Sequence, residues 1–101
     1  MWLFTKLGYF SIGNKNSGAF HVRARRRLDL ENLRHVSEIA APVVSTPDGD
    51  YPFRLIVNQG ELDGIFTALA GGIDYESLKN SIEDSHKLDC YYKIWMLMCM
   101  E

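Results

Sequence analysis

The chain of 101 residues has a composition that predicts a single soluble globular domain. Hydrophobic residues make up 47% and charged residues 24%, which argues against disorder. A net charge of −2 argues neither for a general nucleic-acid binder nor for an acidic mimic. The charge is unevenly distributed. Seven Lys/Arg and three Asp/Glu up to Pro47 give +4, whereas four Lys/Arg and ten Asp/Glu from Asp48 onward give −6. This asymmetry predicts a dipolar surface.

The two cysteines and the apolar first residues bear on the cellular location. Cys90 and Cys99 fall in one predicted helix, where nine residues span about 13 Å, too far for a disulfide. The opening MWLFTKLGYF lacks the basic region, long apolar region and cleavage site of a signal peptide. No apolar run reaches the length of a membrane span. We therefore expect a soluble cytoplasmic protein.

The first half of the chain predicts a hairpin followed by a helix. Residues 2–12 are rich in aromatic and β-branched types and predict one strand with a bulge at Gly8. Residues 14–18 (NKNSG) predict a turn, and residues 20–26 predict the returning strand. Asp29 has the chemistry of an N-cap for a helix that runs to about Ile39, with an expected buried face of Leu30, Leu33 and Val36.

A second hairpin and helix are expected next. Residues 43–46 and 51–57 predict two strands, joined by the turn Pro47-Asp48-Gly49-Asp50. Asn58 and Glu61 have the spacing of a capping box. The helix that follows is predicted to end at Gly71-Gly72, and its apolar positions have helical spacing: Leu62, Ile65, Phe66 and Leu69.

Two further helices are expected at the end of the chain. Asp74 is a candidate cap for a short helix, and Ser85 is a candidate cap for the last one. The expected order is β-β-α-β-β-α-α-α. It predicts an α+β fold in which helices pack on one face of a four-stranded antiparallel sheet, within a single compact domain over residues 1–101.

Several segments together resemble a known group of sequences. They are MWLFTKLGYFSI, VRAR followed by DLENL, DYPFRLIV and IDYESLKNSI. The chain resembles a small uncharacterised family of short bacterial proteins that open with MWLFT and continue with GFFS. Tyr9 and Leu78 stand where that pattern has Phe. The resemblance implies one compact domain and implies no activity, cofactor or catalytic residue.

The segment FHVRARRR is the main candidate binding feature. In a strand, Phe20, Val22 and Ala24 would face the core, and the alternating residues would face outward. If the strands at 20–26 and 51–57 are close, one sheet surface would gather the candidate binding residues Arg23, Arg25, Arg54, His21 and Tyr51, with Lys6 as a further candidate. Clustered guanidinium groups suit phosphate or carboxylate. Trp2, Tyr9 and Tyr51 could add base stacking.

The same surface also has a simpler interpretation, in which it is only the solvent-exposed face of the sheet. A one-sided sheet needs a polar outer face, and Asp48, Asp50 and Glu31 could neutralise the arginines there. Arg26 and Arg27 also have a local explanation, because acidic residues follow them at the helix start.

Metal binding and catalysis have little support in the sequence. His86 and Cys90 have i, i+4 spacing beside Asp89, but no second ligand cluster accompanies them, so no metal or cofactor is expected. The chain contains none of the nucleophile-elbow, phosphate-loop or dinucleotide motifs. A small pocket of His21, Arg54 and Tyr51 is the one candidate for an enzyme or ligand-binding site.

The last helix is the second candidate binding feature. YYKIWMLMCM is apolar on almost every side, as in a central core helix or a helix with a partner on its outer side. For the second case the candidate interface is Tyr92, Trp95, Met96 and Met100, in a homodimer or with another protein.

These features favour a non-enzymatic binding domain: an adaptor, an inhibitor or an accessory subunit. The expected partner is a protein with an acidic patch or a second copy of the chain. The alternative is nucleic-acid binding through the arginine surface, and a small enzyme or ligand-binding domain is a third class. Membrane association is not expected.

Overall fold

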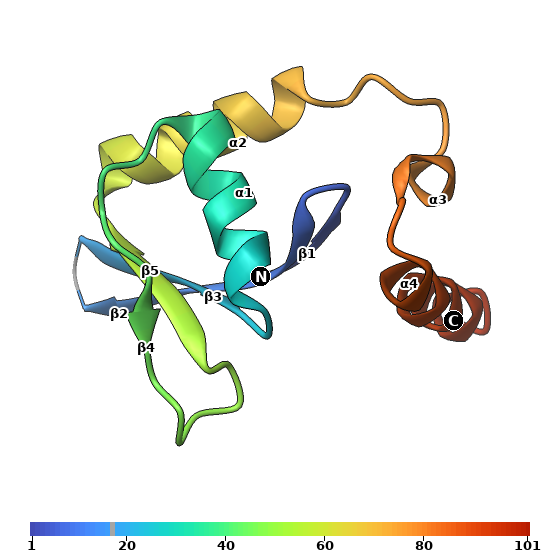
Figure 1. The fold of residues 1–101 in the computed structure, drawn as a ribbon, viewed down its shortest axis with the longest axis horizontal. Coiled ribbons are helices and arrows are strands. Elements are labelled where there is room, and N and C mark those ends of the chain that lie inside the picture. Colours follow the sequence, from blue (N-terminus) through green and yellow to red (C-terminus); the bar gives the residue numbers. More distant parts are fainter. Residues whose placement is uncertain (17) are drawn as a thin grey trace.

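The computed structural model describes residues 1–16 and 18–101 and has an α+β fold (Figure 1). Its antiparallel sheet has five strands in the order β1-β2-β3-β5-β4. The strands are β1 (Trp2–Thr5), β2 (Gly8–Asn16), β3 (Ala19–Ala24), β4 (Val44–Ser45) and β5 (Phe53–Val57). The four helices are α1 (Arg27–Ser37), α2 (Gln59–Gly71), α3 (Leu78–Ser81) and α4 (Ser85–Met98).

The expected four-stranded sheet is wrong by one strand, because residues 2–12 form two strands. The hydroxyl of Thr5 accepts hydrogen bonds from the N–H groups of Leu7 and Gly8 and donates to the carbonyl of Gly8. These bonds stabilise a tight turn between Thr5 and Gly8, after which the chain runs antiparallel to β1 as strand β2. The bulge expected at Gly8 is therefore a turn, and the irregularity lies between Asn14 and Asn16 in the β2–β3 pairing.

Gly8 also marks a close approach between two elements. Its φ is +153°, and a Cβ built there would lie 2.2 Å from Cγ of Asp29 in α1. Glycine tolerates both conditions because it has no side chain. The turn expected at 14–18 is only partly visible, because β2 ends at Asn16, β3 begins at Ala19, and Ser17 lies outside the described residues.

Helix α1 begins three residues earlier than the sequence predicted. Its N-cap is Arg26, so Asp29 lies inside the first turn and does not cap it. Leu30 and Leu33 are fully buried as expected. Val36 is 44% exposed and does not belong to the buried face.

Helix α2 begins with the capping box that the sequence predicted. The side chain of Asn58 accepts a hydrogen bond from the N–H of Glu61 at 2.8 Å, and the carboxylate of Glu61 accepts one from the N–H of Asn58 at 3.0 Å. The helix ends at Gly71 with Gly72 as its C-cap, also as predicted.

The last two helices start at other residues than expected. Ser77 occupies the N-cap position of α3 without a side-chain hydrogen bond to the helix, and Asp74 instead forms an ion pair with Lys6. The cap of α4 is Asp84, whose carboxylate accepts a hydrogen bond from the N–H of Lys87 at 3.0 Å. Ser85 is the first residue of that helix.

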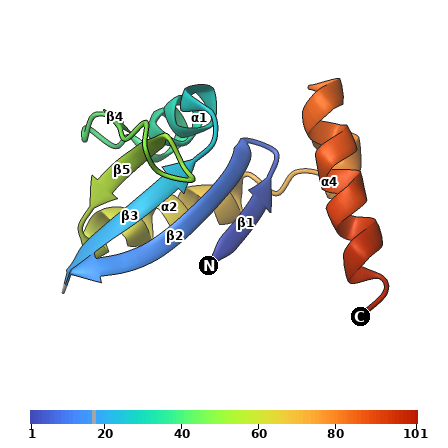
Figure 2. The same ribbon diagram turned by 90° about the horizontal axis from the view of Figure 1, so that it is seen from below.

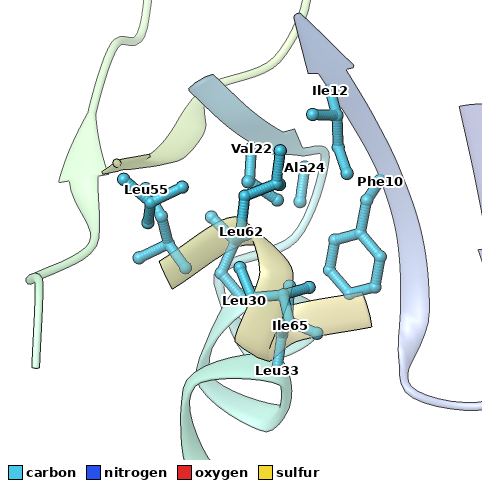
Figure 3. Packing of buried hydrophobic residues seen from close by; sticks show 10 residues of the cluster. Phe10, Ile12, Val22, Ala24, Leu30, Leu33, Leu55, Leu62 and Ile65 are labelled. Atoms are coloured by element: carbon cyan, nitrogen blue, oxygen red, sulfur yellow. The ribbon is translucent and has the colours of Figure 1, made fainter. Parts of the chain in front are cut away.

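The core lies between one face of the sheet and helices α1 and α2 (Figure 3). Its fully buried large side chains come from the sheet and both helices: Phe10, Val22, Leu30, Leu33, Leu55 and Ile65. Helices α3 and α4 do not cover the sheet in this way. Helix α4 lies beyond the β1 edge, beside α3 and apart from α1 and α2 (Figure 2). In the described part of the chain, no helix has the length and apolar character needed to cross a membrane.

Candidate functional site

The arginines of β3 and β5 lie side by side on the sheet face that α1 and α2 leave uncovered, here called the outer face. Arg23 is directly opposite Arg54 in the β3–β5 pairing. Because Val22 and Leu55 point into the core, the alternation of side chains in a strand turns Arg23, Arg54 and His21 outward. The strands β3 and β5 are therefore neighbours, as the expected cluster of arginines required.

Arg23 is held in place by neutral partners. Its Nη2 donates to Oγ of Ser11 at 2.9 Å, and its Nε donates to the carbonyl of Ser11 at 3.4 Å. The guanidinium carbon lies 5.2 Å from the ring centroid of Tyr51, within the range of a cation–π contact. The hydroxyl of Tyr51 hydrogen-bonds that of Tyr9 at 2.8 Å. None of these contacts cancels the charge of Arg23.

Arg54 is hydrogen-bonded to His21 on the outer face. Its Nη1 donates to Nδ1 of His21 at 3.0 Å, and its Nε donates to Oγ1 of Thr46 at 3.3 Å. Because a guanidinium has no acceptor, Nδ1 of His21 carries no proton in this contact. Burial lowers the pKa of His21 below 6.5, and the positive charges of Arg54, Lys15 and Arg23 lower it further. His21 is therefore a neutral member of a cationic surface.

Arg25 completes the set of arginines at the end of β3. Its Nη1 donates to the backbone carbonyl of Asp50, so this contact also involves no carboxylate. The expected neutralisation by acidic residues is not observed, because Glu31 pairs instead with Arg27 and Arg34 on its own helix. Among the described residues, no ion pair involves Arg23, Arg25 or Arg54.

The aromatic side chains near the arginines are mostly engaged. Tyr9 stacks on Phe4 with ring centroids 4.7 Å apart, and its hydroxyl bonds to Tyr51. Burial, together with the hydrogen bond and charge of Tyr51, raises the pKa of Tyr9 to about 12. Trp2 is 70% exposed. Trp2 is therefore the freest of the three predicted stacking residues.

Two of the other basic residues form ion pairs with acidic residues from distant parts of the chain. Lys6 does not add a free charge to the outer face, because it forms an ion pair with Asp74, with Nζ 2.9 Å from Oδ1. Arg26 pairs with Asp84 at 2.8 Å and not with the acidic residues expected at the start of α1, whereas Arg27 does pair with Glu31, at 3.7 Å.

The apolar side chains of α4 are largely exposed. The predicted interface residues Tyr92, Trp95, Met96 and Met100 are 45%, 56%, 51% and 83% exposed, and only Tyr91 of this helix is buried. The alternative of a central core helix does not hold for this chain. Tyr92 and Trp95 lie against each other with ring centroids 5.6 Å apart.

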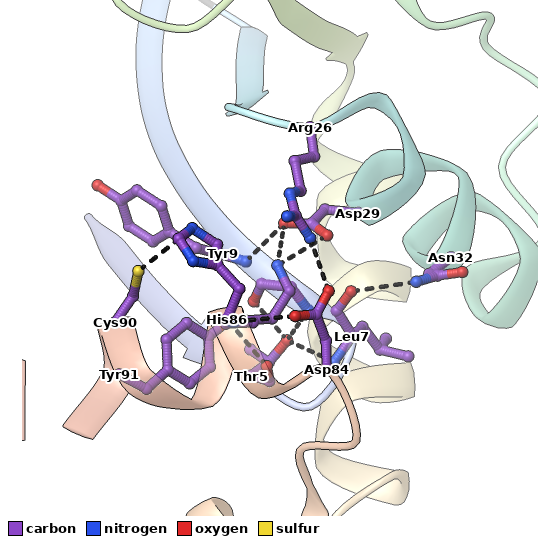
Figure 4. Close-up of polar contacts among 12 residues, drawn as sticks. Thr5, Leu7, Tyr9, Arg26, Asp29, Asn32, Asp84, His86, Cys90 and Tyr91 are labelled. Carbon is purple, nitrogen blue, oxygen red and sulfur yellow. Dashed lines mark hydrogen bonds and ion pairs between the residues drawn. The ribbon is translucent and has the colours of Figure 1, made fainter.

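A buried polar cluster attaches α4 to the rest of the domain (Figure 4). Nζ of Lys87 lies 2.8 Å and 3.0 Å from the two carboxylate oxygens of Asp29. The same carboxylate accepts a hydrogen bond from the N–H of Tyr9 at 3.1 Å. The hydroxyl of Tyr91 donates to the carbonyl of Thr5 at 3.1 Å. No local sequence pattern predicts this cluster, because its members come from three separate segments.

A groove separates α4 from the edge strand β1. It has a volume of about 820 Å³, within the range of about 300–1,000 Å³ that is typical of ligand pockets. Its apolar walls are formed by Trp2 and Phe4 on the sheet and by Tyr91, Ile94, Leu97 and Met98 on the helix. Arg25, Arg26 and His86 lie at the end where α4 begins. None of His21, Arg54 and Tyr51 lines it.

The candidate metal residues do not come together. Nε2 of His86 is 3.8 Å from Sγ of Cys90. Within residues 1–16 and 18–101, no group of three or more His, Cys, Asp or Glu side chains could hold a metal ion. Both cysteines are free and exposed.

Comparison of the chain with protein-family profiles, curated proteins and solved structures finds no match.

Proposed function

We propose that this chain is a non-enzymatic binding domain that recognises an acidic protein partner through its outer face. The observation that carries the proposal is the group of Arg23, Arg25 and Arg54, whose described contacts include no carboxylate. A guanidinium has five N–H donors, and the described contacts engage only some of them. A carboxylate of a partner could bind the remaining donors in a bidentate manner, which gives both geometric fit and charge neutralisation.

The character of α4 supports a protein as the partner. Exposed methionine and aromatic side chains are enriched in protein interfaces. Helix α4 and the residues after it expose Trp95, Met96, Leu97, Met98 and Met100, each more than half exposed. The partner would be a different protein or a second copy of the chain, and the domain would act as an adaptor, an inhibitor or an accessory subunit.

Nucleic-acid binding is the second candidate, favoured by the same arginines together with the exposed ring of Trp2. Two observations weigh against it. The rings of Tyr9 and Tyr51 are held by neighbouring groups, and the chain as a whole has a net charge of −2. A phosphate backbone would meet a small positive surface on an otherwise acidic protein.

The test uses the double variant Arg23→Glu/Arg54→Glu and a control with the same change of charge, Arg27→Glu/Lys93→Glu. Arg27 and Lys93 are exposed, with side chains 52% and 71% exposed, and lie away from the outer face. Each protein is used for affinity capture from a lysate of the organism that encodes it. Captured proteins are purified and titrated by calorimetry, after circular dichroism has shown that both variants fold.

We expect an acidic protein that binds the wild type and the control but not the outer-face variant. If no purified partner distinguishes the two variants, the proposal is wrong.

Nucleic acid is tested separately with fluorescently labelled single- and double-stranded oligonucleotides. Binding through several phosphates would weaken log-linearly with salt, with a slope of about −0.9 per phosphate on duplex DNA. Binding that shows this slope and is lost in Arg23→Glu/Arg54→Glu would replace the acidic protein with nucleic acid as the partner.

A further inference from the structure

Strand β1 forms one edge of the sheet, and its outward backbone groups can be identified from the pairing with β2. Met1 and Ile12 exchange both hydrogen bonds, since Met1 N donates to the carbonyl of Ile12 at 2.9 Å and Ile12 N donates to that of Met1 at 2.8 Å. In an antiparallel pair, such hydrogen-bonded pairs alternate with non-hydrogen-bonded pairs. Leu3 is therefore bonded to β2, and the N–H and C=O groups of Trp2 and Phe4 point away from it.

The ring geometry supports this register. Side chains are closer in a non-hydrogen-bonded pair, and the rings of Phe4 and Tyr9, opposite each other in β1 and β2, stack at 4.7 Å. Two amide groups and two carbonyl groups of β1 thus face the open edge. An edge of this kind is a template for one more strand.

Helix α4 lies beyond this edge (Figure 2). It makes direct contact at one end, where the Tyr91 hydroxyl bonds the Thr5 carbonyl and the Tyr91 ring meets the Phe4 ring at 5.5 Å. Toward Trp2 the space between helix and strand is the apolar groove of about 820 Å³. Its helix side is made by Ile94, Leu97 and Met98, of which Leu97 and Met98 are 67% and 58% exposed.

Together these features specify the chemistry of an occupant. The backbone groups of Trp2 and Phe4 require another extended backbone, which a lipid or a nucleic acid does not supply. The walls of the groove require apolar side chains. A second copy of the sheet would have to approach edge to edge, where the contacts of Tyr91 with Thr5 and Phe4 stand in the way. A single peptide segment is narrow enough to enter beside them.

The charges at the groove end add a further requirement. Lys87 is paired with Asp29 and Arg26 is paired with Asp84, so those two cations are already neutralised. Arg25 also lines this end, and its described contact is to a backbone carbonyl. An acidic side chain on the occupant would complement it.

We propose that the groove between β1 and α4 binds an extended segment of a partner protein, which adds to β1 as a further strand. Alternate apolar side chains of the segment pack against Leu97 and Met98, and an acidic residue at one end reaches Arg25. This inference rests on the proposed function for the existence of a protein partner, and it names the part of that partner that would be inserted.

The test begins with selection of peptides from a random library displayed on phage, using the whole chain as bait. Selected peptides are synthesised with the ordinary backbone and with N-methyl groups at alternate amides, which remove the hydrogen bonds of a strand. We expect an alternating apolar pattern with an acidic end. N-methylation in one of the two alternating sets should abolish binding.

Amide exchange measured by NMR provides a readout for single residues. The N–H groups of Trp2 and Phe4 should exchange rapidly in the free protein and become protected in the complex. The N–H of Leu3, already bonded to β2, serves as the internal control.

Matched variants locate the site on α4. The side chain of Met98 lines the groove, whereas Lys93 of the same helix is 71% exposed and does not line it. We expect Met98→Ser to weaken peptide binding about tenfold and Lys93→Ser to leave it unchanged. Arg25→Glu should weaken the acidic peptides, and Arg23→Glu/Arg54→Glu should not, so failure of the groove and failure of the outer face are distinguishable.

Three results would overturn the inference. The first is a library that yields no binder, and the second is binders that leave the Trp2 and Phe4 amides unprotected. The third is a dimer in analytical ultracentrifugation that Met98→Ser dissociates, which would assign the groove to a second copy of the chain.

Discussion

Lys87 of α4 places its Nζ 2.8 Å from Oδ2 of Asp29 in α1, joining residues that are far apart in the sequence. The side chain of Lys87 is 14% exposed and that of Asp29 is 4% exposed, so both charged groups are largely shielded from water. Such a pair is held by mutual attraction and by further hydrogen bonds, here from the N–H of Tyr9. It links α4 to α1 and, through Tyr9, to β2.

The first prediction concerns this ion pair. Asp29→Asn keeps an acceptor for the N–H of Tyr9 but leaves the charge of Lys87 without its partner. We expect the free energy of unfolding to fall by about 3 kcal/mol, near the lower limit for breaking a buried pair, because Lys87 keeps some contact with water. Chemical denaturation measures it.

The control is Asp89→Asn, which breaks the exposed pair with Lys93 on the same helix. Exposed pairs contribute little to stability, so this variant should unfold like the wild type. Equal stability of Asp29→Asn and Asp89→Asn would show that Lys87 and Asp29 do not act as a buried pair.

The second prediction concerns Gly8, whose backbone lies against the side chain of Asp29. In Gly8→Ala the new methyl group would lie 2.2 Å from Cγ of Asp29, at a φ of +153° that L-residues rarely adopt. Either Asp29 or the start of β2 must move, and we expect a loss of at least about 2 kcal/mol. Thermal unfolding checks this.

Gly64→Ala in α2 should have the opposite effect. A Cβ at Gly64 meets no atom within 4 Å, and alanine is favoured over glycine inside a helix by roughly 0.5–1 kcal/mol. A Gly8→Ala variant as stable as the wild type would contradict the close packing of β2 on α1.

The third prediction concerns the position of α4. Tyr91→Phe retains the ring against Phe4 but removes the hydroxyl that donates to the carbonyl of Thr5. We expect a loss of about 1 kcal/mol and faster amide exchange in the first turns of α4. Tyr92→Phe, in a 45% exposed side chain, should change neither. If exchange in α4 is the same in both variants, the hydroxyl does not fix the helix.

The features that the sequence predicted correctly depend on residues close in the chain. The capping box of Asn58 and Glu61 spans three residues, and Arg23 was placed opposite the core face by simple alternation along a strand. The coarse fold, an antiparallel sheet with four helices, follows from the same local patterns.

The features that it missed depend on distant partners. Asp29 has the chemistry of a cap, yet its carboxylate is used by Tyr9, twenty residues earlier, and by Lys87, fifty-eight residues later. The missed turn after Thr5 relies on a side-chain hydroxyl, which a strand-like composition conceals. The apolar pattern of α4 resembles that of a core helix, and only the three-dimensional arrangement shows that its residues are exposed.

The last prediction is a pH dependence that originates at His21. In the unfolded chain its pKa is close to 6.5, whereas in the folded protein burial and the charges of Arg54, Lys15 and Arg23 lower it. The unfolded state therefore binds more protons as the pH falls through 6.5, and the folded state loses stability. We expect the free energy of unfolding to decrease from about pH 7.5 to about pH 5.5.

The variant His21→Gln should lose less stability over this range than the wild type, because glutamine has no proton to gain. His35→Gln, at an exposed position of α1, is the matched control and should retain the wild-type slope. Asp84, whose pKa is held at about 2 by hydrogen bonds from the N–H of Lys87 and from Arg26, affects stability only at lower pH. If wild type and His21→Gln lose stability in parallel between these pH values, then His21 is not held neutral against Arg54.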